Sequence, residues 1–252
     1  MMEITLENHK QTAPSDVIER VTLLNDIDEG IELIKSLLCT KREPVILSFI
    51  NAHCYNLCCE NPEFCNALLK SDVILRDGVG MKILYNSINK NPGFNFCGTD
   101  VIPRLLDSLA DKRLVLLGTQ EPYLSQAANK LNKQEKEIVL TEHGFHPMEY
   151  YVQATKDARP EVVLLGMGMP KQELVAEILK RELQYPCLII NGGAIIDMIA
   201  GKVPRAPKWI RNVGMEWAYR LLKEPKRLFK RYVIGNLLFL KRMRQLKNTF
   251  YK

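Results

Sequence analysis

Residues 161–173 of the chain read EVVLLGMGMPKQE, and this stretch decides how the fold is interpreted. Its first part, Glu161–Leu165, is a short apolar run typical of a strand buried on both faces of a parallel sheet. Gly166 and Gly168 follow, and glycine allows a tight turn in which the backbone approaches a ligand closely. Because Pro170 suits the first turn of a helix, the stretch predicts a strand, a glycine-rich turn and a helix.

The same order of apolar run, turn and helical pattern recurs along the chain. Four further runs are short and rich in Val, Ile and Leu: Val45–Ile50, Asp72–Arg76, Arg113–Leu117 and Pro186–Ile190. Helix starts are expected at Val101, with Thr99 or Asp100 as its cap, at Glu121-Pro122 and at Pro147. The alternation predicts an α/β fold with an open, mostly parallel, Rossmann-like sheet and helices on both faces.

The net charge of +6 on the 252 residues is unevenly distributed. Residues 202–252 hold 15 Lys and Arg and two acidic residues, giving +13, whereas residues 1–201 hold 20 basic and 27 acidic residues, giving −7. Such a basic block favours phosphate on nucleic acid, on anionic lipid or on a substrate. The chain is therefore expected to have three parts: an N-terminal extension (1–41), an α/β catalytic core (42–201) and a basic helical appendage (202–252).

The extension is expected to contain a strand at Glu3–Glu7 and a helix at Asn25–Leu38. Asp26 and Asp28 have the spacing of a metal-binding pair, but at a helix start they read as a cap. The first ten residues, MMEITLENHK, are polar and acidic, unlike a signal peptide.

Cysteine usage and hydropathy both favour a cytoplasmic protein that does not span the membrane. The seven cysteines are an odd number, which favours reduced thiols. Cys54, Cys58 and Cys65 can share an apolar helical face, so we interpret them as core residues rather than metal ligands. The longest apolar stretch of the appendage, Tyr232–Leu240, has nine residues, and a spanning helix needs about 20.

Polar and glycine-rich residues follow the predicted strands, and parallel sheets bind ligands in the crevice outside the carboxyl ends of their strands. The candidate substrate-binding residues of the core are Asn51, His53, Gly78, Thr99, Asp100, Gly118, Gly166, Gly168, Lys171, Gly192 and Gly193. The Gly-x-Gly-x-Pro spacing differs from the Gly-x-Gly-x-x-Gly dinucleotide fingerprint, which argues against a nicotinamide-dependent oxidoreductase.

Three side chains near the strand ends have two interpretations each. Asp77 follows an apolar strand directly, where it is either a general base open to the crevice or the cap of the next helix. His53 is either a second base or a structural residue. Lys171 lies in a first helical turn, where the helix dipole disfavours a cation, so it either meets a negative ligand or is simply solvated.

Six motifs follow one another in a fixed order: Asp77-Gly78, Gly98-Thr99-Asp100, Gly166–Glu173, Ala200–Trp209, Gly214–Leu221 and Glu224–Leu228. The series resembles the WecG/TagA/CpsF glycosyltransferases, glycosyltransferase family 26, over about Val45 to Tyr232. The Pro-Lys-Gln-Glu and Arg-Ala-Pro-Lys-Trp signatures make the resemblance specific.

The resemblance implies an inverting transferase that needs neither metal nor another cofactor, with Asp77 as the catalytic base and Gln172 as a second catalytic residue. It implies transfer of an N-acetylmannosamine-type or related hexose from a UDP-sugar donor to a polyprenyl-diphosphate-linked sugar, in cell-surface polysaccharide biosynthesis. Arginines of the appendage are expected to close over the site and meet the diphosphate: Arg205, Arg211 and Arg220.

One departure from the family pattern leaves the donor open. Phe49 stands where many members have Thr, two residues before the retained Asn51. UDP-glucose or UDP-N-acetylglucosamine is therefore an alternative donor. A nucleic-acid-binding protein is the alternative class, but the basic residues of the appendage alternate with an apolar face and form no recognised nucleic-acid-binding motif.

The apolar face of the appendage predicts that the protein binds to a membrane surface. Placed at 100° per residue, five side chains of the tail fall within one narrow arc: Leu228, Tyr232, Phe239, Met243 and Leu246. Lys230, Arg231, Lys241 and Arg242 lie opposite. A basic amphipathic helix lies on an anionic membrane surface, although the alternative is a helix docked on its own domain. We expect a peripheral protein on the inner face of the cell membrane, and a homo-oligomer is compatible with the sequence.

Overall fold

Six parallel strands form one sheet in the computed structural model, which describes residues 13–250 apart from the side chains of Asn212 and Thr249. The strand order is β2-β1-β6-β5-β3-β4. The strands are β1 Val45–Ile50, β2 Val73–Arg76, β3 Arg113–Gly118, β4 Glu137–Glu142, β5 Val162–Gly166 and β6 Leu188–Asn191. All five pairings are parallel, so the carboxyl ends of the strands share one edge. The predicted α/β fold with an open parallel sheet is confirmed.

Strand β4 is absent from the strands that the sequence predicts. Its apolar run, Ile138–Leu140, is only three residues long and lies between Glu137 and Thr141. The strand pairs with β3 alone and is partly exposed along its length. An edge strand needs no continuous apolar run, which explains why the pattern is weak there.

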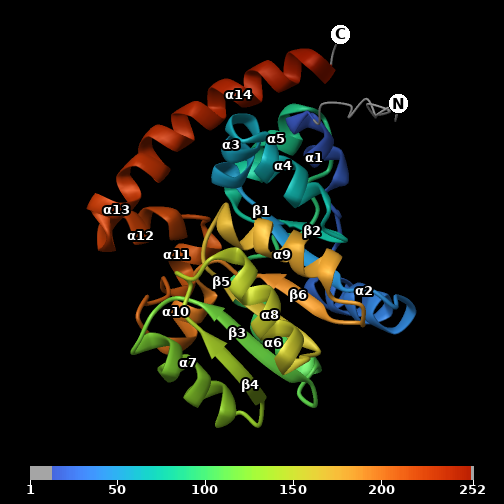
Figure 1. The fold of residues 1–252 in the computed structure, drawn as a ribbon. Coiled ribbons are helices and arrows are strands. Elements are labelled where there is room, and N and C mark those ends of the chain that lie inside the picture. Colours follow the sequence, from blue (N-terminus) through green and yellow to red (C-terminus); the bar gives the residue numbers. More distant parts are fainter. Residues whose placement is uncertain (1–12, 251–252) are drawn as a thin grey trace, which may run out of the picture.

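Helices cover both faces of the sheet, as predicted (Figure 1). One face carries α2 Ile27–Thr40, α6 Gly98–Ser108, α7 Tyr123–Asn132 and α10 Ile195–Ala200. The other carries α8 Met148–Ala158 and α9 Lys171–Glu182, with α1 Pro14–Arg20, α3 Ala52–Glu60, α4 Pro62–Leu69 and α5 Val79–Ser87 packed together at the β1–β2 end. Burial of each Leu, Ile or Val side chain between these layers stabilises the folded state by about 1.5–3 kcal/mol. The core formed in this way holds the strand ends in place.

Four predicted helix starts can be compared with the structure. The starts predicted at Glu121-Pro122 and Pro147 are confirmed to within two residues, because α7 begins at Tyr123 and α8 at Met148. Asp26 caps α2, because its Oδ1 accepts a hydrogen bond from Glu29 N at 2.8 Å. The predicted start at Val101 with a Thr99 or Asp100 cap is wrong, because α6 begins at Gly98 after Cys97. Asp100 instead lies within the first helical turn, where the helix dipole favours an acid. The strand predicted at Glu3–Glu7 lies outside the described residues.

Cys54, Cys58 and Cys65 are buried among the apolar residues of α1, α3, α4 and α5, which confirms their interpretation as core residues. Across residues 13–250, no helix combines the length and the apolar character that a membrane crossing requires.

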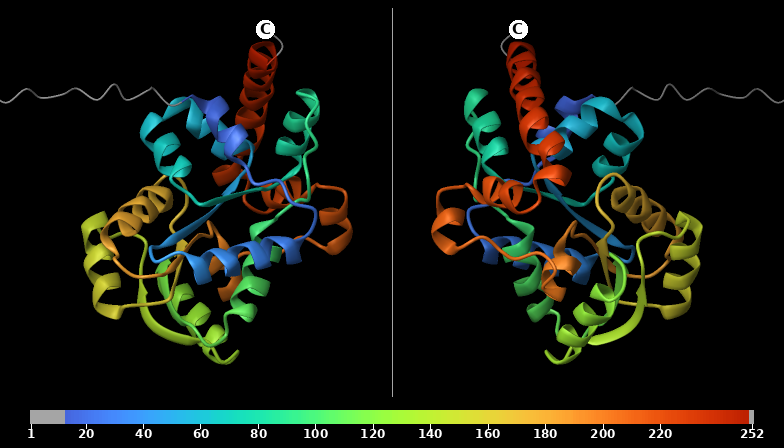
Figure 2. Two further views of the ribbon diagram at one scale, coloured as in Figure 1. Left: turned by 90° about the vertical axis from the view of Figure 1, so that its right-hand side faces the viewer. Right: turned by 90° about the vertical axis from the view of Figure 1, so that its left-hand side faces the viewer.

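The appendage consists of α11 Lys208–Asn212, α12 Glu216–Lys223, α13 Pro225–Phe229, the π-helix η1 Lys230–Ile234 and α14 Gly235–Phe250. Helix α14 runs along α3 and α5 (Figure 2). The Phe239 ring meets Tyr55 edge-on at 5.9 Å, and Arg242 donates to Asn56 O at 2.8 Å and to Glu60 at 2.9 Å.

The predicted direction of the tail's apolar arc is therefore wrong for most of its members. Leu228, Phe239 and Leu246 are buried, and the last two pack on the body of the protein instead of facing outward. The exposed apolar side chains of this region are different ones: Phe229, Ile234, Leu237 and Leu240.

Candidate active site

Asp77 stands at the carboxyl end of β2, at one edge of the sheet. Its backbone N–H donates to Ile50 O at 2.8 Å, which holds it beside the end of β1. Helix α5 begins after Gly78, whose φ of +87° suits glycine, and Gly78 is the residue at the cap position. Asp77 is therefore not the helix cap, which removes the structural alternative for this side chain.

Buried Arg76 fixes the backbone around Asp77. Its guanidinium donates to Pro92 O at 2.7 Å, to Gly93 O at 3.1 Å and to Gly78 O at 3.1 Å. These bonds tie the turn after β2 to the loop that precedes α6. The carboxylate of Asp77 is thus presented by a rigid frame at the mouth of the crevice.

The appendage changes the electrostatics of Asp77. Burial raises the pKa of Asp77 to about 6, and Glu216 of α12 raises it further, whereas a hydrogen bond with Asn51 and the charges of Arg231 and Arg76 oppose the rise. A general base works best when its pKa lies near the working pH. The pKa of Asp77 therefore lies closer to neutral pH than that of an ordinary aspartate.

His53 lies at the start of α3, in the same crevice. Burial lowers the pKa of His53 to about 4, and the Arg231 charge adds to this effect. The ring is thus neutral at pH 7 and feels the same arginine as Asp77. Asn51 has two roles, because its Oδ1 accepts from Cys54 N at 3.0 Å to cap α3 and its side chain also bonds Asp77.

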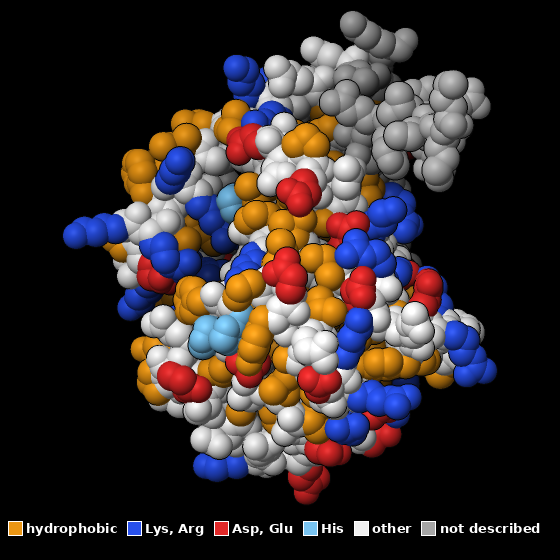
Figure 3. Space-filling view, in the orientation of Figure 1, with side chains coloured by type: hydrophobic (Ala, Val, Ile, Leu, Met, Phe, Trp, Pro, Cys, Tyr) orange, Lys and Arg blue, Asp and Glu red, His pale blue; other side chains and the backbone are white. Residues whose placement is uncertain are grey.

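Arginines of the appendage converge on this edge of the sheet. Arg205 forms an ion pair with Asp100 at 2.5 Å, and Arg211 approaches the same oxygen at 3.4 Å. Arg220 lines a cavity of about 200 Å³ together with Lys202, Val203, Pro204, Tyr219, Lys223 and Glu224. Figure 3 shows Lys and Arg side chains gathered around a hollow beside α12 and α13.

Three arginines of the appendage have a buried Nε with no hydrogen-bond partner in the part of the chain that the structure describes: Arg205, Arg220 and Arg231. An unpartnered buried donor costs free energy, so such a cluster is suited to an anion that arrives from outside. The sequence predicts Arg205 and Arg220 as ligand-binding residues but not Arg231, which it places on the side of the tail away from the apolar arc. The π-helix η1 turns Arg231 inward, and no local signal in the sequence marks that turn.

The glycine turns after β5 and β6 are joined by Gln172, which is 1% exposed. Its Oε1 accepts from Gly168 N at 3.2 Å and from Gly193 N at 3.0 Å, and its Nε2 donates to Glu173 at 2.8 Å. The two turns therefore share one bridging side chain that lies beneath the crevice.

Other predicted residues have structural partners in this state. Lys171 Nζ donates to Gly144 O at 2.9 Å and to His146 O at 2.6 Å, so it is not simply solvated. An added Cβ on Gly118 would lie 2.4 Å from the Gly166 carbonyl carbon, so close backbone packing requires glycine there. Thr99 lies within 3.1 Å of the Cys97 sulfur. Direct contact of Lys171, Gly118 or Thr99 with a ligand stays a prediction.

The strand order spreads these groups along one edge. Asp77, Asn51, the Gly192-Gly193 turn, the Gly166–Gly168 turn and Gly118 follow β2, β1, β6, β5 and β3 in that spatial order. With neighbouring strands about 4.8 Å apart, this row is about 19 Å long. A row of this length suits an extended ligand.

Comparisons with known proteins show which family the chain matches. Residues 18–251 match the model of the Glycosyl transferase WecG/TagA/CpsF family. A protein of Bacillus subtilis (strain 168) is 24% identical over 245 residues, which cover 94% of this chain and 95% of that protein. A protein of Bacillus spizizenii is 26% identical over 178 residues, 67% of each chain. Both are named N-acetylglucosaminyldiphosphoundecaprenol N-acetyl-beta-D-mannosaminyltransferase.

Proposed function

This chain belongs to the WecG/TagA/CpsF glycosyltransferase family, and on that premise we propose that it moves an N-acetylmannosamine-type hexose from a UDP-sugar to a lipid-diphosphate-linked sugar. The names of the two Bacillus relatives support this acceptor and this sugar. The product would enter cell-surface polysaccharide biosynthesis.

The observation that carries the proposal is that Asp77 lies within the electrostatic influence of buried Arg231, which in turn lies near Arg220. Asp77 would take the proton from the acceptor hydroxyl as its oxygen attacks the anomeric carbon from the face opposite UDP. The bond to the diphosphate breaks, its electron pair leaves with UDP, and the configuration inverts. Arg220 and Arg231 would stabilise the departing charge, since fixed donors in a water-poor site stabilise developing charge strongly.

Phe49 bears on the choice of donor. It is buried in β1 and lies 3.8 Å from the position that a Cβ on Gly98 would occupy. A large ring therefore fills the space below the start of α6, where a smaller side chain would leave room. UDP-glucose and UDP-N-acetylglucosamine remain alternative donors for this reason.

The test is a panel of UDP-sugars offered with a synthetic N-acetylglucosaminyl-diphospho-lipid acceptor. We expect UDP release and a product that is one hexose larger with UDP-N-acetylmannosamine, and lower turnover with the two alternative donors. Faster transfer from either alternative would reassign the sugar, and inactivity with all three would refute the proposed function.

Transfer is expected to need no divalent cation. The guanidinium groups of Arg220 and Arg231 supply the positive charge that a metal ion supplies to the leaving diphosphate in other transferases. The initial rate should therefore stay within about twofold in excess EDTA. Loss of the rate in chelator and its recovery with Mg²⁺ or Mn²⁺ would show that a metal carries this charge.

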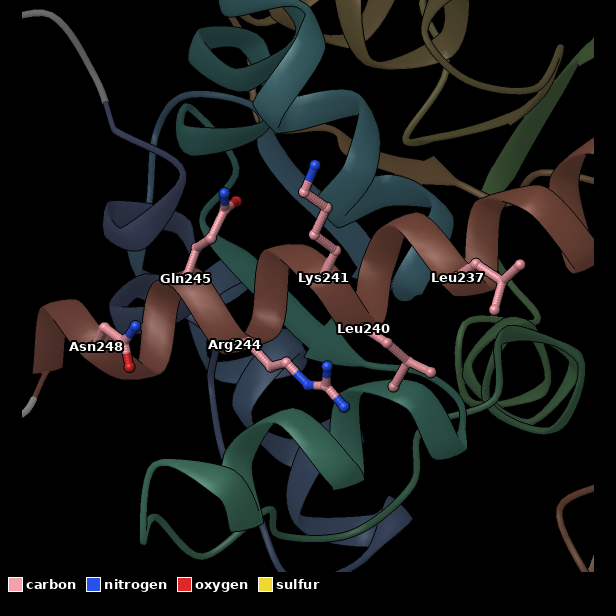
Figure 4. Close-up of a pocket in the computed structure, with 6 residues that line it drawn as sticks. All are labelled: Leu237, Leu240, Lys241, Arg244, Gln245 and Asn248. Atoms are coloured by element: carbon pink, nitrogen blue, oxygen red, sulfur yellow. The ribbon is translucent and has the colours of Figure 1, made fainter.

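The lipid acceptor requires the protein to reach a membrane, and we propose that it does so peripherally on the inner face. The appendage exposes several large apolar side chains, including Leu222 at 81%, Trp209 at 70% and Leu237 at 67%. A groove of about 410 Å³ along α14 combines two leucines with basic and polar groups: Leu237, Leu240, Lys241, Arg244, Gln245 and Asn248 (Figure 4). Apolar side chains beside Lys and Arg suit an anionic lipid surface.

A further inference from the structure

Glu173 is a buried carboxyl group that the proposed reaction does not use directly. It is 1% exposed, on the side of α9 that packs against the sheet. Its Oε1 accepts from Gln172 Nε2 at 2.8 Å, and its Oε2 has no hydrogen-bond partner. Burying an ionised carboxyl group costs free energy. The position of Glu173 in the interior therefore calls for an explanation.

Within residues 13–250, the side chain that donates to this carboxyl group is the Gln172 amide, which joins the two glycine turns. The Gln172 carbonyl oxygen accepts from Gly168 N and Gly193 N, one from each turn. A carboxamide makes these bonds only when its oxygen points at the turns and its nitrogen points away from them. Glu173 Oε1 accepts from that nitrogen, so it selects this orientation over the flipped one.

We propose that Glu173 is a positioning residue that acts through Gln172, fixing the amide that holds the turns after β5 and β6 in register at the carboxyl edge of the sheet. Its catalytic consequence rests on the proposed function. Its structural consequence does not, because the Gln172 bonds exist in the free protein.

The ability of Glu173 to hold the Gln172 amide in place depends on its charge state. Burial raises the pKa of Glu173 to about 8, and the bond from Gln172 opposes the rise. The charged groups on elements packed against α9 lie toward its far end, where Lys156 of α8 pairs with Glu182, and Asp72, beside β2, pairs with Lys180. At its near end, Lys171 is directed to the loop after β4. Glu173 is therefore neutral at pH 7 and ionises as the pH rises through about 8.

The sign of the pH effect follows from this. The folded state holds the proton more tightly than the unfolded chain, in which a glutamate titrates near 4.5. The protein therefore loses stability relative to a Glu173→Gln variant as the pH rises from 4.5 to about 8. We also expect kcat/KM to fall along an alkaline limb in the upper part of this pH range, because the uncompensated buried charge of ionised Glu173 destabilises the packing around Gln172.

The experiment compares Glu173→Gln, Glu173→Ala and, as a control on the same helix, Glu177→Gln. We expect Glu173→Gln to keep kcat/KM at pH 7 within about threefold and to lack the alkaline limb. Glu173→Ala leaves Gln172 Nε2 without its acceptor and should lower kcat/KM by about 10–100-fold, because small displacements of a reacting group are costly. Glu177→Gln should retain the wild-type pH profile. UDP affinity and melting temperature are measured from pH 5 to 9.5 on the same proteins.

Wild-type kcat/KM in Glu173→Ala, or an unchanged alkaline limb in Glu173→Gln, would overturn the proposal. If Glu173→Ala does not fold, Glu173→Gln decides alone. If the wild type transfers no sugar, the proposed function fails, and the melting temperatures then decide about Glu173. A difference in melting temperature between Glu173→Gln and the wild type that grows as the pH rises supports the proposal. A difference in melting temperature that is the same at every pH refutes it.

Discussion

Replacing Asp77 with Asn is expected to lower kcat by about 10²–10⁴-fold while UDP binding stays near that of the wild type. Asn has the size and the hydrogen-bonding capacity to keep the contact with Asn51, but it cannot accept a proton from the acceptor hydroxyl. The expected pH dependence follows from the raised pKa of Asp77, about 6. Wild-type kcat/KM should rise as the pH increases through that value, and the residual activity of Asp77→Asn should not.

A matched control changes the environment of the base without removing it. Glu216 raises the pKa of Asp77, so Glu216→Gln should move the acid limb to lower pH while leaving a working base. Turnover of Asp77→Asn close to the wild-type value would end the assignment. His53 would then be the next candidate, because its neutral ring can accept a proton at pH 7.

Local signals predict the part of the site that the sheet builds. The apolar run, the glycines and Pro170 predict β5, its turn and α9 within a few residues, since each of these features acts over its immediate neighbours. The fold then places Asp77 and Asn51 on adjacent strand ends, as parallel pairing requires. The bridging role of Gln172 depends on two turns that are 25 residues apart in the sequence, from Gly168 to Gly193, and no local pattern contains it.

The appendage shows why local sequence patterns do not predict the remaining site residues. A spacing of 100° per residue assumes an unbroken α-helix, but η1 at Lys230–Ile234 is a π-helix and shifts the register between α13 and α14. Arg231 consequently lies close enough to Asp77 to affect its pKa. Arg242 reaches α3 because it follows Phe239 by three residues in α14 and so shares the face that packs on the body. π-Helical turns occur frequently at functional sites, which agrees with the position of this one.

The double substitution of Leu237 and Leu240 with Asp is expected to release the protein from anionic liposomes. Both leucines are exposed, so the change should leave the fold intact, whereas deleting the tail from Lys226 would also remove Phe239 and Leu246 from the core. Losing two inserted leucines costs about 2–4 kcal/mol, which corresponds to about 30- to 1000-fold in lipid affinity. The rate of transfer to a long-chain acceptor in vesicles should fall together with the lipid affinity, whereas UDP affinity should not change.

The binding of each variant to anionic membranes is measured by liposome co-sedimentation at low and high salt. Phe145→Asp is the matched control, because Phe145 is 71% exposed but follows β4 at the opposite edge of the sheet from α14. The basic residues of the appendage contribute about 1 kcal/mol each near an anionic surface, so wild-type binding should weaken as salt rises. The tail deletion should show the same release, and any loss of melting temperature in it would report the buried part of α14. Equal sedimentation of the wild type and the Leu237/Leu240 variant, or no wild-type binding at low salt, would mean that this face of α14 does not meet the membrane.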